Sequence, residues 1–521
     1  MRQSENRAAR SRQGMITTPH HAASEAGAKV LLRGGTAIEA VIAAGAALTV
    51  LYPHFCGLGG DAIWIVADGS GRRQTIMGIG QAAEHLPVLD AIPQRGPLSA
   101  LTTAALVDSW GEALRYSSEN WHGSETLATL LADAIELAAR GFPVSRSQKH
   151  WHNFRAAEIP NWPGFEAHFV TDGIQRQPQL ASVLERIALH GHREFYEGEL
   201  AQRIANGLEA AGSPIRLRDM QKTAARMVDP LSMVYRGVEL LAPPPPSQGV
   251  TTLGIIGVLQ NFDMANVDPS SAEFYHLCVE AVKQAFLDRG AIADPDVVAQ
   301  ACDDWLNQAV LSRKAAAIDR HVARPWPAVH QTGDTVYLAA VDHAGRCASV
   351  LQSTYYDWGS GVLLCDTGIL WQNRGAAFST DPASPNVLAP GKRPFYTLNP
   401  GIGLRDGKPY LLYGTQGADG QPQTLTLLLS RLIDHGFDPL SALSAPRFLL
   451  GRTFSDTRDN LKIEASVGDE VIGKLQAMCH ETIAIPALSA LAGQAGVIRL
   501  SEDGWIDGAH DPRSDGCAIG M

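Results

Sequence analysis

An alanine-rich segment followed by a glycine turn and an apolar run constrains this fold most. Residues 37–51 (AIEAVIAAGAALTVL) predict a helix packed tightly against a neighbour, and Pro53 ends it. The next stretch, FCGLGGDAIWIVAD, predicts a glycine turn that leads into a strand. At 521 residues the chain is long for a single core, so two domains or one large layered fold are expected.

The first two thirds of the chain are predicted to be mostly helical. Helical spacing in HHAASEAGAKVLLRGG ends at Gly34-Gly35, and further helices are expected at 104–116, 126–140, 178–188, 198–211 and 271–289. Residues 1–14 are expected to form an irregular tail. Residues 243–249 (PPPPSQG) must be extended, and the region from Asp294 to Asp334 lacks periodicity, which predicts an exposed loop.

From Thr335 onward the pattern changes to strands. TVYLAAVD and CASVLQSTY, joined by a turn at 343–346, predict a hairpin. GVLLCDTGILWQN predicts more β structure, and QTLTLLLSRLIDHG predicts an amphipathic helix that stops at Gly436.

Charge and composition exclude several classes of protein. Lys and Arg number 43 against 54 Asp and Glu, and this net charge of −11 argues against a nucleic-acid binder. No run reaches the roughly 18–20 apolar residues of a membrane span, and the polar N-terminus does not have the pattern of a secretory signal. The seven cysteines are scattered and odd in number, so we expect reduced thiols and a cytoplasmic location.

Three apparent motifs are better explained as structural. Residues 468–475 (GDEVIGKL) have the spacing of a phosphate loop, but Leu475 stands where Ser or Thr must reach magnesium. Residues 359–361 (GSG) lack the strand–elbow–helix setting of a serine hydrolase and predict a turn. Five histidines lack partners at metal-ligand spacing, so no metal or other cofactor is expected; they are His20, His21, His54, His150 and His152.

The sequence Gly333-Asp334-Thr335 stands where the featureless region meets a clear strand. A Thr hydroxyl is a poor nucleophile at its ordinary pKa. It becomes competent if the chain is cut before it, because the freed α-amino group can act as its base. Taken alone this is a weak indication, since any Thr can begin a strand.

The surrounding sequence resembles the gamma-glutamyltransferase family of self-cleaving N-terminal nucleophile hydrolases. The resemblance runs from about Thr18 to the C-terminus. It is carried in the first half by PHHAASEAGAKVLLRGGTAIEAVIAAGAALTVLYPHFCGLGGDA, FYEGELA, YRGVELLAPPPPSQG and EAVKQAFLDR. In the second half it is carried by GDTVYLAAVD, WGSGV, TGILWQNRG, APGKRPFYTLNP, YGTQGADGQPQT and GAHDPRSDGCAIG.

The resemblance implies an α+β fold, a four-layered αββα sandwich made as one precursor. Cleavage between Asp334 and Thr335 would give a large subunit of residues 1–334 and a small subunit of residues 335–521. The two would stay together as a heterodimer, with a dimer of heterodimers left open. No nucleic acid or membrane partner is implied.

The resemblance also implies roles for single residues. Thr335 aligns with the nucleophile, and Ser353 with a hydroxyl that hydrogen-bonds the nucleophile region. Gly417 and Ala418 fall on the turn whose backbone N–H groups form the oxyanion hole. That role needs amide donors and no side chain, so Ala418 can replace a glycine if its backbone angles allow.

The residues that would hold a γ-glutamyl donor depart from the family pattern. Gln81, Tyr396 and Thr397 replace the Arg-Ser-Ser clamp for the α-carboxylate. Tyr355, Arg374 and Ala377 replace the groups that hold the α-amino group. Arg374 offers only donors and a positive charge, so it would repel an ammonium and could grip a carboxylate.

Several functions follow from these departures. We expect an amidohydrolase for a short anionic amide, oxamate being the best candidate, with Arg374 as its carboxylate clamp. A structural ion pair is the alternative role for Arg374. Alternative activities are a glutaryl-cephalosporin-type acylase and a γ-glutamyl hydrolase or transpeptidase acting on glutathione-like donors. An uncleaved binding or scaffold protein is the alternative that involves no catalysis.

Overall fold

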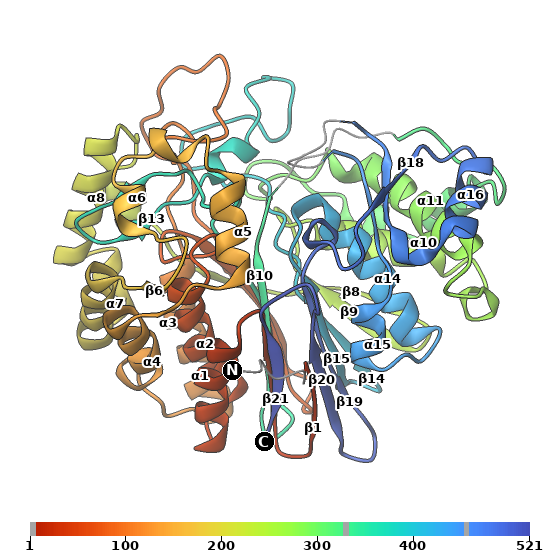
Figure 1. Cartoon of the computed structure of the whole chain (residues 1–521), viewed down its shortest axis with the longest axis horizontal. Coiled ribbons are helices and arrows are strands. Elements are labelled where there is room, and N and C mark those ends of the chain that lie inside the picture. The colour runs from red at the N-terminus through yellow and green to blue at the C-terminus, as the bar shows by residue number, and fades with distance from the viewer. Residues whose placement is uncertain (1–6, 327–332, 453–457) are drawn as a thin grey trace.

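The computed structural model describes residues 7–326, 333–452 and 458–521, and it has the four layers that the sequence predicts (Figure 1). Two seven-stranded sheets lie face to face in the middle, and a layer of helices covers the outer side of each sheet. Within these residues no helix is long and apolar enough to cross a membrane.

The first sheet has the strand order β21-β2-β10-β11-β3-β4-β7. Its strands are Cys517–Gly520, Met15–Thr18, Val336–Val341, Cys347–Ser353, Asp61–Ala67, Arg73–Gly78 and Arg226–Val228, in that order. The predicted hairpin is β10 and β11, which are antiparallel neighbours at its centre. The helices of the outer layer are α1 (His21–Leu32), α2 (Ala37–Leu51), α3 (Leu106–Trp121), α4 (Leu127–Arg140), α7 (Pro178–His190) and α8 (Glu199–Ala211).

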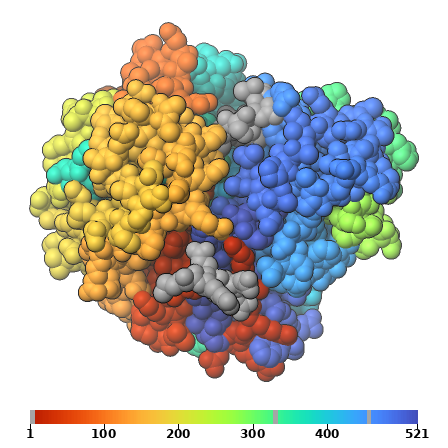
Figure 2. Space-filling model, in the orientation of Figure 1, coloured from red at the N-terminus to blue at the C-terminus, as the bar shows by residue number. Residues whose placement is uncertain are grey.

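The second sheet has the order β1-β20-β19-β15-β14-β9-β8. Its strands are Ala8–Ser11, Ile506–His510, Ala495–Leu500, Lys408–Thr415, Gly401–Arg405, Val238–Ala242 and Leu231–Tyr235. Its outer helices are α10 (Gly249–Leu259), α11 (Ala272–Arg289), α14 (Gln421–Ile433) and α15 (Pro439–Ser444). In the space-filling view, yellow-orange residues from the first half of the chain and blue C-terminal residues meet along one face (Figure 2).

Smaller elements complete the chain. Two short antiparallel pairs join β5 (Phe142–Pro143) with β6 (Ile174–Gln175) and β12 (Leu363–Leu364) with β13 (Ile369–Leu370). A three-stranded sheet joins β16 (Phe448–Leu450), β17 (Leu461–Glu464) and β18 (Thr482–Ile485). The remaining α-helices are α5 (Arg146–Phe154), α6 (Phe165–His168), α9 (Leu217–Gln221), α12 (Cys302–Trp305), α13 (Gln308–Ala316) and α16 (Asp469–Ala477).

Strand alternation fixes which side chains lie between the sheets. In β10, Val336 and Leu338 pack against the first helical layer, whereas Tyr337 and Ala339 join the core between the two sheets. The inter-sheet core also includes Leu351 of β11, and residues of both sheets contribute to it. Thr335 immediately precedes β10 and so continues its inward-facing row.

Two predictions of irregular structure are wrong. Residues 1–14 are not all tail, because β1, which falls within them, pairs with β20. The stretch after Asp294 is not all loop, because α12 and α13 form within it and Leu311 and Ala315 of α13 are buried. Of the loop predicted just before Thr335, residues 327–332 lie outside the described residues.

Candidate active site

Three polar residues stand in one row at the end of the first sheet. The register of β10 and β11 pairs Val336 with Gln352, so Thr335 stands opposite Ser353. The register of β11 and β3 then pairs Ser353 with Asp61. Side chains directly opposite one another lie on the same face, here the face toward the second sheet. All three residues are buried, with at most 1% of Thr335 exposed.

The Ser353 hydroxyl joins the predicted nucleophile to the bond that it would cut. Ser353 Oγ donates to the carbonyl oxygen of Asp334 at 2.6 Å and accepts from Thr335 Oγ1 at 3.3 Å. The backbone N–H of Tyr355 donates to the same Oγ at 2.7 Å. One donor and two acceptor sites are the full capacity of a hydroxyl, so its orientation is fixed toward the Asp334 carbonyl.

The side chain of Asp334 lies in a buried setting that disfavours its charge. Burial raises its pKa well above the ordinary value, and the nearby Asp357 carboxylate adds to this shift. Asp357 is itself held by Arg95 at 2.9 Å and Arg155 at 2.5 Å. The side-chain amide of Gln416 donates to Asp334 Oδ1 and to the Thr335 carbonyl oxygen, both at 3.1 Å. The residues on either side of the predicted cut are therefore anchored from the second sheet's side.

The turn predicted to form the oxyanion hole follows β15. Gly417 has φ 116° and Ala418 has φ 45°, so both residues of the turn have a positive φ, which is uncommon for an alanine. In the part of the chain that is described, neither backbone N–H donates to a protein group. A β-carbon on Gly333 would lie 3.1 Å from the Ala418 side chain, which places this turn beside the predicted cut.

Gln248, which sequence reasoning did not single out, holds this turn in place. Its side-chain Nε2 donates to the carbonyl oxygens of Ala418 at 2.8 Å and Thr397 at 2.9 Å. Arg289 of α11 donates to Gln248 Oε1 at 3.3 Å and pairs with Asp419. The signal in the sequence is a polar residue in PPPPSQG, after the prolines and before an apolar helix.

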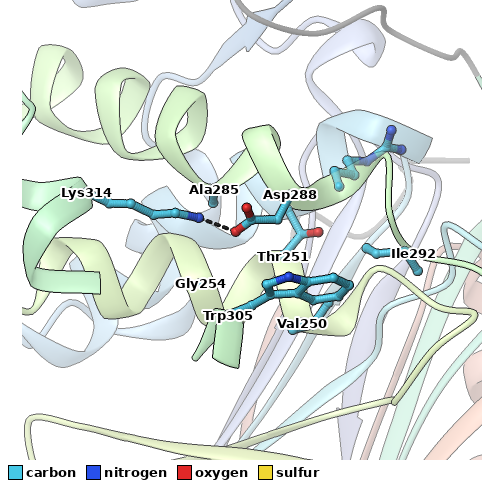
Figure 3. A pocket seen from close by; sticks show the side chains of 9 residues that line it. Val250, Thr251, Gly254, Ala285, Asp288, Ile292, Trp305 and Lys314 are labelled. Atoms are coloured by element: carbon cyan, nitrogen blue, oxygen red, sulfur yellow. Dashed lines mark hydrogen bonds and ion pairs between the residues drawn. The ribbon is translucent and has the colours of Figure 1, made fainter. Parts of the chain in front are cut away.

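A small cavity lies beside Arg289 and is lined by residues of α10, α11, α12 and α13 (Figure 3). Figure 3 shows Lys314 pointing at Asp288, with which it forms an ion pair, and the Trp305 ring beside Val250. The volume of about 10 Å³ holds roughly one water molecule. This cavity is therefore too small to take a substrate.

Arg374 is a buried cation whose donors are unused. None of its three side-chain nitrogens has a hydrogen-bond partner, and no carboxylate lies within 4.0 Å of it among the described residues. Its Cζ lies 3.9 Å from the ring centroid of Tyr355 and 4.4 Å from that of Tyr396. The two aromatic rings stabilise the charge through cation–π contact and leave the N–H groups available.

The backbone around Arg374 is held rigidly. Asn373 Nδ2 donates to Gln94 O at 2.7 Å, and Gly375 N donates to Ser99 O at 3.1 Å. A β-carbon at position 375 would lie 2.5 Å from that Ser99 oxygen, so only glycine fits. These contacts fix where the guanidinium stands before any ligand arrives.

Tyr355 adopts an unusual backbone conformation. Its φ of 81° is left-handed, which for a bulky residue costs about 1–3 kcal/mol. The strain persists because Tyr355 N bonds Ser353 and its carbonyl oxygen accepts from Asp334 N at 2.5 Å. The same residue thus touches the predicted cut through its backbone and Arg374 through its ring.

The remaining predicted binding residues have structural contacts of their own. Gln81 Nε2 donates to Asp219 O and to Thr223 Oγ1, both at 3.2 Å. Ala377 packs with Tyr355 and the neighbouring Tyr356, and Thr397 meets Gln248 through its carbonyl oxygen. Their roles toward a substrate stay predictions.

Metal-ligating side chains gather at one place that the sequence analysis did not name. His276, Glu280 and His480 are buried with ligand atoms within 4.8 Å of one another. His276 Nδ1 and His480 Nε2 are 2.8 Å apart, and His276 Nε2 donates to Asp319 O at 2.7 Å. Lys283 lies 2.7 Å from Glu280, a positive charge where a cation would bind. The group is best explained as a hydrogen-bonded junction.

The three apparent motifs lie on ordinary structural elements. The phosphate-loop-like residues 468–475 lie at the start of the helix α16. Gly359 and Gly361 have φ of 52° and 72°, as expected for a turn. His54 is buried, and its Nε2 lies 2.8 Å from Ser147 Oγ.

Comparisons with known proteins identify the family of the chain. The profile of the family described as gamma-glutamyltranspeptidase matches residues 23–521. The chain belongs to this family. Oxamate amidohydrolase proenzyme of Klebsiella pneumoniae is 42% identical over 97% of this chain and 98% of its own. Glutathione hydrolase-like YwrD proenzyme of Bacillus subtilis is 37% identical over the same shares.

The fold agrees with a solved structure of similar sequence. The cephalosporin acylase of Bacillus halodurans superposes with a TM-score of 0.90 at 28% identity, covering 99% of this chain and 97% of its own. The chain is therefore an amidohydrolase of this family, with the fold of the N-terminal nucleophile hydrolases. The predicted family, fold class and enzyme class are confirmed.

Proposed function

We propose that the precursor cuts itself between Asp334 and Thr335, and that the mature enzyme hydrolyses a short anionic amide, with oxamate as the best candidate. The buried, unpaired guanidinium of Arg374 between two tyrosine rings carries this proposal, because it is a preformed site for one carboxylate. The identity with the Klebsiella pneumoniae relative supports the choice of oxamate.

Self-cleavage uses the hydrogen bonds that join Thr335, Ser353 and Asp334. Thr335 Oγ attacks the Asp334 carbonyl carbon, its proton passes to Ser353 Oγ, and Ser353 gives its own proton to the carbonyl oxygen. The C–N bond then breaks, its nitrogen takes up the proton that the former carbonyl oxygen gives back, and an ester joins Asp334 to Thr335 Oγ. Water hydrolyses the ester, which leaves a carboxylate on Asp334 and a free α-amino group on Thr335.

Turnover uses the new N-terminus as its own base. The α-amino group takes the proton of Thr335 Oγ as the oxygen attacks the substrate amide carbon. The N–H groups of Gly417 and Ala418 stabilise the oxyanion, and the loss of one such donor costs about 10²–10³ in rate. The α-amino group passes this proton to the leaving nitrogen, which departs from oxamate as ammonia, and water then releases the acyl group as oxalate. Arg374 would hold the carboxylate next to the scissile carbonyl.

An ammonia-release assay tests the proposal directly. Mature protein is given oxamate, glutamine, glutathione and a glutaryl amide in parallel, and oxamate is expected to react fastest. A denaturing gel accompanies the assay and should show two fragments. A single full-length band that persists for days would favour a binding or scaffold protein, and a preference for glutaryl amides would favour an acylase.

γ-Glutamyl anilides should be poor donors. The α-ammonium of such a donor would meet the Arg374 guanidinium, and it would find no acceptor at Ala377. The loss of charge-assisted contacts of ~1.5–3 kcal/mol each lowers kcat/KM by about tenfold or more per contact. Release of the aniline is followed against ammonia release from oxamate. Efficient transfer of glutamyl from glutathione to a dipeptide would contradict this prediction.

Ser353→Ala should slow self-cleavage by about 10²–10³-fold, because it removes the donor on the Asp334 carbonyl. The conversion of precursor is followed over time on a denaturing gel. Ser349→Ala is the matched control, since Ser349 lies on the same face of β11 and bonds the Tyr337 hydroxyl at 3.1 Å. Equal rates in the two variants would show that Ser353 has no special part in cleavage.

We also propose a cytoplasmic location. All seven cysteines are unpaired thiols in the structure, as expected in a reducing compartment. Fractionation of the native host tests this, and amidase activity in the periplasmic or secreted fraction would contradict it.

A further inference from the structure

We infer that Asp61 is a positioning residue for the anionic-substrate site, because its carboxylate holds the Tyr396 ring against one face of the Arg374 guanidinium. The inference rests on the proposed function of Arg374 and adds a residue to it. Asp61 comes from the glycine turn FCGLGGDA, more than 300 positions from Arg374 in the sequence.

The two oxygens of Asp61 have different tasks. Oδ1 accepts from the backbone N–H of Gly80 at 3.1 Å and of Ala105 at 2.9 Å. Oδ2 accepts from the Tyr396 hydroxyl at 2.8 Å. One oxygen thus ties together the start of β3, the end of β4 and the chain before α3, while the other reaches across to the Tyr396 ring.

Tyr396 separates the carboxylate from the guanidinium. Its ring lies under Arg374, with 4.4 Å from Cζ to the ring centroid, and its hydroxyl points at Asp61. Asp61 therefore stays beyond the 4.0 Å of an ion pair, and the Arg374 donors are not spent on it. A carboxylate placed directly on Arg374 would compete with the carboxylate of the substrate.

The electrostatics of Asp61 agree with this arrangement. Burial raises its pKa to about 6, and the Arg374 charge and the Tyr396 hydroxyl are among the groups that oppose this rise. The Asp61 carboxylate and the Arg374 guanidinium thus attract each other electrostatically across the Tyr396 ring. Asp61 also stands next to Ser353 in the sheet, so the carboxylate site and the cleavage site share one framework.

The test compares Asp61→Asn, Tyr396→Phe and the double variant in the mature enzyme. Asp61→Asn keeps a side-chain oxygen that can accept from the N–H groups of Gly80 and Ala105, but it replaces the oxygen that accepts from the Tyr396 hydroxyl. Tyr396→Phe removes the hydroxyl that donates to Asp61. Each single variant should raise the KM for oxamate by about tenfold and change kcat by less than about twofold. The double variant should raise the KM for oxamate no further than the more damaging single variant does, since both substitutions affect the same hydrogen bond.

Two further readouts separate positioning from a merely structural role. Turnover of oxamide, which has no carboxylate, should change little, and oxalate binding measured by calorimetry should weaken in step with the KM for oxamate. Precursor cleavage, followed on a denaturing gel, checks that each variant folds. If the Asp61→Asn precursor is not cleaved, the kinetics of Tyr396→Phe are the test.

If the wild-type enzyme hydrolyses oxamate, either of two results would overturn the inference about Asp61. One is an equal loss with oxamate and oxamide, and the other is a double variant whose KM effect is the product of the single effects. If the wild type neither hydrolyses oxamate nor binds oxalate, the proposed function itself fails, which is a different outcome from either of these.

Discussion

Thr335→Ala is expected to leave a full-length precursor with no measurable amide hydrolysis. One hydroxyl makes the attack in both reactions, and it is the hydroxyl that donates to Ser353 beside the Asp334 carbonyl. Removing a catalytic nucleophile lowers kcat on the order of 10⁶-fold. The measurements are a denaturing gel over several days and ammonia release from oxamate.

Thr335→Ser is the matched control, because it keeps the hydroxyl and removes only a methyl group. It should still be cut and should retain part of the activity. The thermal midpoint of Thr335→Ala should stay close to that of an uncut wild-type precursor. Fragments of normal size from Thr335→Ala would show that the cut lies elsewhere.

Arg374→Ala is expected to raise the KM for oxamate by more than tenfold while maturation continues. The guanidinium would make two charge-assisted hydrogen bonds to the substrate carboxylate, each worth about 1.5–3 kcal/mol. Self-cleavage involves no substrate carboxylate, so the gel should still show two fragments. Arg374→Lys keeps the charge and loses the fork, and it should fall between Ala and wild type.

The neutral analogue oxamide supplies the control for this prediction. Its turnover should change little in Arg374→Ala, because it has no carboxylate to lose. If both substrates suffer equally, or if the precursor fails to mature, Arg374 has a structural role and the carboxylate is bound elsewhere.

Local pattern was enough to predict much of the fold. The long helices α2, α4 and α11 and the hairpin of β10 and β11 follow from apolar periodicity and from turn residues. The strand β1 was missed because AARS has no apolar alternation and forms only through its pairing with β20. The helices α12 and α13 were missed because they are short, with four and nine residues.

The candidate site likewise contains some residues that the sequence could identify and others that it could not. Thr335 could be found because a sequence junction marks it, and Arg374 because it departs from a known pattern. Asp61, Gln248 and Gln416 could not be found, because their roles depend on contacts between distant segments. Strand register brings Asp61 beside Ser353, and no local feature of FCGLGGDA reports this.

The placement of β10 in the first sheet affects how the mature protein dissociates and how it refolds after denaturation. With the proposed cut, β10 and β11 belong to the small subunit but are flanked by β2 and β3 of the large one. In the second sheet, β14 of the small subunit pairs with β9 of the large one. Dilution should therefore not release the subunits, since their separation would break the hydrogen bonds between neighbouring strands in both sheets. Once unfolded by denaturant, however, the mature enzyme has become two molecules, so its recovery should depend on protein concentration, whereas the uncut Thr335→Ala chain should refold at any dilution.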